Sequence, residues 1–94
     1  MVNTMEHNPL ISYNNGLEIT YSDLKKDERG EYVTIYFERP NNNDSMFDSA
    51  QIDYPFGKLT NIHGFDIDDF ALLNDQIRRN GELALSFSKE AQYA

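Results

Sequence analysis

Apolar and polar residues alternate along the first two thirds of the chain, and this pattern predicts β-strands. Residues 17–24, LEITYSDL, have a period of two, which gives a strand one buried face and one wet face. They are separated from residues 10–13 by Asn-Asn-Gly at 14–16, a sequence that suits the tight turn of an antiparallel hairpin. We therefore expect residues 10–13 and 17–24 to form the first hairpin.

The alternation continues downstream and predicts more strands. The polar stretch 25–30 closes a second hairpin onto residues 31–39, whose odd-numbered apolar residues are expected to face the core. Pro40 ends this strand, because proline has no amide donor for the ladder. After a polar loop, residues 49–55 alternate again and predict a fourth strand. Residues 58–63 are expected to form a short fifth strand or to cross to the helix.

After Gly64 the apolar period changes from two to 3.6, which predicts a C-terminal helix packed on the sheet. We expect this helix to be kinked or broken at Asn80-Gly81, because glycine costs about 1 kcal/mol inside a helix and is favoured just past a helix end. Residues 82–91 also alternate like a strand, but helix is preferred because the stripe continues in register. The stripe that is expected to face the sheet consists of Phe70, Leu73, Ile77, Ala84, Phe87 and Ala91.

The predicted fold class is therefore α+β, with an antiparallel sheet of four to five strands and the helix on one face. The 94 residues predict a single small domain, 1–94, in which residues 1–9 form a flexible N-terminal segment. Six Phe and six Tyr supply large side chains for the core, and the absence of cysteine excludes disulfides and thiolate zinc sites. The order of strands before helix is similar to that of small bacterial domains of unknown function; no residue role follows from this.

The charge of −8 is concentrated in residues 40–77, which carry seven acidic residues and one basic residue. This distribution argues against nucleic-acid binding, which needs clustered Lys and Arg, and is compatible with a basic protein partner. No run approaches the roughly 20 apolar residues that span a bilayer, and the N-terminus lacks the basic and apolar regions of a signal peptide. We expect a cytoplasmic protein that does not bind membranes, and the pattern leaves monomer or homodimer open.

Three aspartates, Asp66, Asp68 and Asp69, stand where the helix is predicted to begin. A side-chain oxygen at this position accepts hydrogen bonds from the first-turn amides, and the helix dipole favours carboxylates there. Helix capping is therefore the preferred interpretation. The alternative is a Ca²⁺ or Mg²⁺ site, or an acid–base centre, built on His63, Asp66 and Asp68.

Other candidate residues are few, and none is nominated as catalytic or as binding a cofactor. Tyr32, Tyr36 and Tyr54 are expected to form a protein-binding patch on the sheet face away from the helix, because tyrosine is enriched at interfaces. Two classes of function follow. The preferred one is a non-enzymatic binding or regulatory domain of bacterial or phage origin, such as an immunity protein, antitoxin or inhibitor. The alternative is a metal-assisted or acid–base enzyme centred on His63, Asp66 and Asp68.

Overall fold

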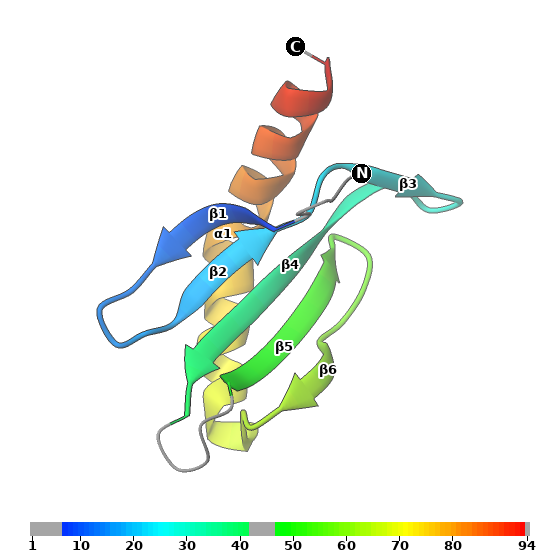
Figure 1. Cartoon of the computed structure of the whole chain (residues 1–94). Coiled ribbons are helices and arrows are strands. Elements are labelled where there is room, and N and C mark those ends of the chain that lie inside the picture. The colour runs from blue at the N-terminus through cyan, green and yellow to red at the C-terminus, as the bar shows by residue number, and fades with distance from the viewer. Residues whose placement is uncertain (1–6, 42–46, 94) are drawn as a thin grey trace, which may run out of the picture.

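The computed structural model describes residues 7–41 and 47–93, and within them an antiparallel sheet and one helix form an α+β fold (Figure 1). This is the fold class that the change in apolar period predicts. The elements are β1 (Asn8–Ser12), β2 (Glu18–Tyr21), β3 (Lys25–Asp27), β4 (Gly30–Pro40), β5 (Phe47–Tyr54), β6 (Thr60–His63) and α1 (Ile67–Tyr93).

The sheet has the strand order β1-β2-β4-β5-β6, and every neighbouring pair is antiparallel. The long strand β4 lies in the middle and also pairs with β3 at its N-terminal end. Figure 1 shows α1 lying across one face of this sheet. We call the face that α1 covers the inner face and the opposite one the outer face.

The core lies between α1 and the inner face. Alternation along β4 places Val33, Ile35 and Phe37 inward, as expected, and all three are almost fully buried. Their neighbours across the sheet are apolar as well, since Phe37 pairs with Ile19 on β2 and with Ala50 on β5. The buried apolar residues are Leu17, Ile19, Val33, Ile35, Phe37, Ala50, Ile52, Phe65, Leu73, Ala84 and Leu85.

Several element boundaries differ from those predicted. Lys25–Asp27 is the strand β3, because these residues pair back onto the start of β4, although the polar composition predicted only a turn. Residues 8–9 belong to β1, which corrects the expected flexible segment 1–9 at that end; residues 1–6 lie outside the described part. Residues 47–48 belong to β5 and not to the loop, whose residues 42–46 lie outside the described part.

The helix α1 runs without a break through Asn80-Gly81, so the predicted break is wrong, whereas the preference for helix over residues 82–91 is confirmed. The close approach of the sheet explains the glycine. A Cβ atom at Gly81 would lie 2.3 Å from Cε2 of Tyr54 on β5. Gly81 is therefore required by packing between the layers and does not mark the end of the helix.

The buried side of α1 is rotated from the predicted stripe. Leu73 and Ala84 are buried as expected, but Phe87 is 40% exposed and Ala91 lies on the surface. Small or polar residues, Gln76, Gly81 and Ser88, take part of the buried side instead. Because small side chains let the helix approach the sheet closely, Phe87 lies on the flank, where its ring contacts that of Tyr21 at 6.3 Å between centroids.

Candidate functional site

Asp66 is the N-cap of α1. Its Oδ1 accepts hydrogen bonds from the amides of Asp68 and Asp69, at 3.0 and 3.2 Å, and Asp69 Oδ2 accepts one from the amide of Asp66 at 3.0 Å. This reciprocal pair is a capping box with aspartate at the third helical position. Asp68 lies in the first turn, where the helix dipole favours its charge. The capping interpretation of the three aspartates is confirmed.

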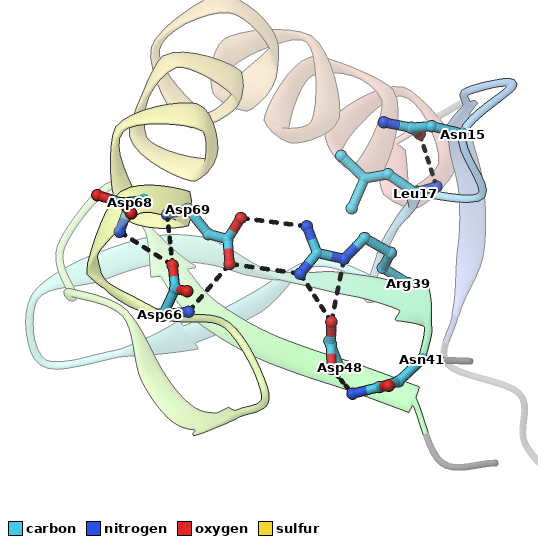
Figure 2. A network of polar contacts seen from close by, with 8 residues as sticks. All are labelled: Asn15, Leu17, Arg39, Asn41, Asp48, Asp66, Asp68 and Asp69. Atoms are coloured by element: carbon cyan, nitrogen blue, oxygen red, sulfur yellow. Dashed lines mark hydrogen bonds and ion pairs between the residues drawn. The ribbon is translucent and has the colours of Figure 1, made fainter. Parts of the chain in front are cut away.

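Asp69 also connects the start of the helix to the sheet through Arg39 of β4 (Figure 2). The Arg39 guanidinium donates to Asp69 Oδ1 and Oδ2 at 3.2 and 3.3 Å, and to Asp48 Oδ2 on β5 at 3.0 and 2.7 Å. Asn41 donates to the other oxygen of Asp48 at 2.9 Å. One arginine thus joins β4, β5 and α1, and we call Arg39, Asp48 and Asp69 the Arg39 network.

Within the Arg39 network, the contacts between Arg39 and Asp69 favour the charged forms of these two side chains. The hydrogen bonds from Arg39, followed by the one from the Asp66 amide, hold the pKa of the Asp69 carboxyl below its usual range. Asp48 is only 5% exposed, and Gly64 leaves room for it, since a Cβ at Gly64 would lie 2.0 Å from Asp48 Oδ1. Hydrogen bonds within the fold satisfy these carboxylates, so their positions are explained without a catalytic role.

The position of His63 does not support the metal site or acid–base centre of the alternative hypothesis. It is exposed at the end of β6 and pairs across the sheet with Ser49, while Asp66 is engaged in the helix cap. Among residues 7–41 and 47–93, no group of three or more His, Asp or Glu side chains is placed to hold a metal ion. The structure therefore does not bring His63, Asp66 and Asp68 together as a metal-ligand set.

Tyr54 does not belong to the expected tyrosine patch, because it lies on the inner face. Its ring packs on Gly81, and its hydroxyl donates to Oε2 of Glu82 on α1 at 2.8 Å. Burial, and after it the hydrogen bond to Glu82, raise the pKa of the Tyr54 hydroxyl. The alternation in the sequence predicts this inward position, since Tyr54 is an even-numbered residue of β5 like the buried Ala50 and Ile52.

Tyr32 and Tyr36 do share the outer face, where each contacts a second ring or a cation. Tyr36 stacks on His7, with ring centroids 3.8 Å apart and an interplanar angle of 18°. The Arg29 guanidinium lies 5.3 Å from the centroid of the Tyr32 ring and 5.2 Å from that of Phe56. Two of the three tyrosines therefore lie on the face on which they were expected.

A shallow hollow of about 300 Å³ lies beside Tyr36 on the outer face. We call it the outer hollow and take it as the candidate binding site. β4, β5, β6 and the residue before β1 all contribute to it. Its wall includes His7, Tyr36, Glu38, Gln51, Asn61 and His63.

Sequence reasoning identified only part of the outer hollow. Tyr36 and His63 were singled out, but for different sites, and His7 was assigned to a flexible terminus. Glu38 and Gln51 have the outward parity of Tyr36 in the strand pairing, so the alternation carried a signal for them. Nothing local brings His7 to Tyr36, because they are far apart in the sequence.

Comparison with known proteins adds no assignment, since no protein-family model, curated protein or solved structure matches this chain. No helix within the described ranges is both long enough and apolar enough to cross a membrane.

Proposed function

We propose that this protein is a non-enzymatic protein-binding domain of the regulatory kind, such as an immunity protein, antitoxin or inhibitor, and that its outer face meets a basic partner. The observation that carries the proposal is the division of the sheet into two unlike faces. The inner face is covered by α1, while the outer face presents aromatic rings, polar side chains and the outer hollow.

The side chains of the outer face are of the kind that protein interfaces favour. Aromatic rings with a polar end bury area on binding while their polar atoms keep a hydrogen-bond partner. Tyr36 is already stacked on His7, and Tyr32 carries the Arg29 guanidinium over its ring. These contacts restrict the rings before a partner arrives, which lowers the entropy that binding costs.

The edges of the sheet are less suited to binding than its outer face. Pro9 stands in the edge strand β1, where the register is also irregular between Pro9 and Ile11. The other edge strand, β6, has only four residues and its register is irregular as well. Proline, bulges and short strands hinder the addition of a foreign strand. A partner is therefore expected to contact the face.

The net charge of −8 supports a partner of opposite sign. A strongly acidic surface raises the rate at which a basic protein associates and discourages acidic competitors. This effect is long-ranged and depends on ionic strength. It complements the outer face, whose contacts would determine specificity.

The proposal is tested by affinity capture from a native lysate with matched variants. Gln51→Arg places a long, charged side chain in the wall of the outer hollow, and Asn74→Arg introduces the same charge on the exposed surface of α1. We expect the wild type and Asn74→Arg to retain the same partner at low salt, and Gln51→Arg to lose it. Thermal melts show whether all three proteins are folded. Failure of the wild type to retain a partner, or equal retention by Gln51→Arg, would contradict the proposal.

A further inference from the structure

Two glutamates lie directly opposite one another at the edge of the outer hollow. Glu38 lines the outer hollow, and Glu18 on β2 is its cross-strand partner. Both are exposed, and together with Gly16, Pro40 and Phe47 they line a second hollow of about 300 Å³. Glu38 therefore stands between two hollows of the same sheet face.

This arrangement does not serve the stability of the sheet. Like charges directly opposite in an antiparallel pair are destabilising, whereas opposite charges at the same place are favourable. Neither Glu18 nor Glu38 has an ion-pair partner within the part of the chain that the structure describes. No Lys or Arg side chain of residues 7–41 and 47–93 therefore compensates the pair.

The arginines of the chain are all engaged with other carboxylates. Arg29 pairs with Asp27, Arg39 with Asp48 and Asp69, and Arg78 and Arg79 with Asp75. The fold thus uses its arginines at four other acidic residues. The Glu18–Glu38 pair is left as two adjacent carboxylates to which a cation could be added.

The outer hollow supplies the remaining features of an arginine site. The His7–Tyr36 stack gives it an aromatic wall, and Gln51 and Asn61 bring polar side chains. A guanidinium is planar, stacks on aromatic rings and binds carboxylates through two hydrogen bonds, whereas an ammonium group is a strongly hydrated point charge. Glu38 is the charged residue of the wall, so the hollow favours a cation.

We infer that the outer hollow receives an arginine side chain of the protein partner, with its guanidinium at Glu38 and Glu18. The inference rests on the proposed function and names the chemistry that the partner must bring. It assigns Glu18 and Glu38 to recognition, and Tyr36 and His7 to the wall against which the guanidinium lies.

The test is an NMR titration of the ¹⁵N-labelled full chain with a tetra-arginine amide peptide. We expect saturable shifts at the amides of Glu38, Gln51 and His63. In the double variant Glu18→Gln/Glu38→Gln the apparent affinity should fall at least about tenfold, which corresponds to about 1.4 kcal/mol, because charged hydrogen bonds to the guanidinium are lost. The matched control is Glu28→Gln/Glu90→Gln, which changes the net charge equally at exposed positions elsewhere.

Equal weakening in both double variants would overturn the inference, because it would show attraction to net charge alone. Shifts confined to α1, or tighter binding of a tetra-lysine peptide than of tetra-arginine, would overturn it as well. Thermal melts guard against misfolding, since Glu18→Gln/Glu38→Gln removes a repulsive pair and should melt no lower than the wild type. A partner captured through the outer face whose binding ignores this variant would leave the proposed function standing and the arginine site refuted.

Discussion

At Gly81, a contact with one ring decides which residue the helix can contain. Glycine weakens helices because it has the greatest backbone freedom, yet α1 continues through it. The ring of Tyr54 occupies the space into which a side chain at position 81 would project. Packing between the layers therefore outweighs the intrinsic preference of the residue.

We expect Gly81→Ala to destabilise the protein although alanine favours helix. The gain in helix propensity is about 1 kcal/mol, while forcing a methyl group against a rigid ring costs about 1–3 kcal/mol. Urea unfolding should show a lower free energy of unfolding, because the new Cβ atom would lie 2.3 Å from Cε2 of Tyr54. In a Tyr54→Leu background the same substitution should become neutral or stabilising. A loss of equal size in both backgrounds would show that the ring is not the cause.

The pKa of Asp69 leads to a second prediction at the scale of a single residue. Its pKa is lowered in the folded protein, chiefly by hydrogen bonds from Arg39. The stabilisation is therefore complete above the unfolded pKa of about 3.9 and is lost as the pH falls through the lower folded value. The stability difference between wild type and Asp69→Asn should be largest near pH 7 and shrink below about pH 4, as measured by urea unfolding.

Asp68→Asn is the matched control, because Asp68 is exposed in the same helical turn and makes none of the Arg39 contacts. The effect of Asp68→Asn on the free energy of unfolding should be small both near pH 7 and below about pH 4. If Asp68→Asn and Asp69→Asn showed the same pH dependence, the Arg39 contacts would not be the source of the acid sensitivity.

Among the elements, the Arg39 network holds the first turn of α1 against β4 and β5. Arg39 neutralises Asp48, which is only 5% exposed, and at the same time binds Asp69 in the helix cap. The Arg39 guanidinium also lies 4.6 Å from the centroid of the Phe65 ring. Three elements and the residues that lead into the helix are therefore fixed by one side chain.

We expect Arg39→Gln to lower the free energy of unfolding by about 2–4 kcal/mol, because it leaves a buried carboxylate without its counter-charge. The control is Arg78→Gln on α1, where the Arg78 side chain is 75% exposed in its pair with Asp75. That change should cost no more than about 0.5 kcal/mol. Equilibrium urea unfolding distinguishes the two. Similar losses for both variants would mean that Asp48 is satisfied without Arg39.

The sequence predicts the positions and buried faces of the strands much better than it predicts which strands pair. Alternation in residues 31–39 gives the inward and outward side chains of β4 without reference to the rest of the chain. The strand β3 was not predicted, because Lys-Lys-Asp shows no alternation of apolar and polar residues. Only its pairing with β4 defines it as a strand. The rotation of α1 was also missed, since it depends on small residues that matter only against a sheet.

For the molecule as a whole, charge is the dominant property. The chain carries 16 acidic and eight basic side chains, a net charge of −8, and several of the basic ones are engaged in ion pairs. Like charges repel one another more strongly in the compact state than in the unfolded chain. The acidity that would steer a basic partner therefore costs the fold some stability.

Salt should consequently stabilise the protein. At 0.1 M ionic strength the Debye length is about 10 Å, compared with about 30 Å at 0.01 M, so added NaCl screens repulsion across the surface while affecting the buried part of the Arg39 network less. We expect the melting temperature at pH 7 to rise by a few degrees between 10 and 200 mM NaCl. A fall over this range would show that attractive surface pairs outweigh the repulsion.

The sequence by itself determined the α+β class, the alternation of the strands, the start of the helix at Asp66 and the acidity of the chain. These follow from periodicity, capping and composition, which act between residues close together in the chain. The tertiary structure decided the continuity of α1 at Gly81, the inward position of Tyr54, the Arg39 network and the outer hollow. Each of these depends on strand register and on the seating of the helix, which bring together residues that local patterns treat separately.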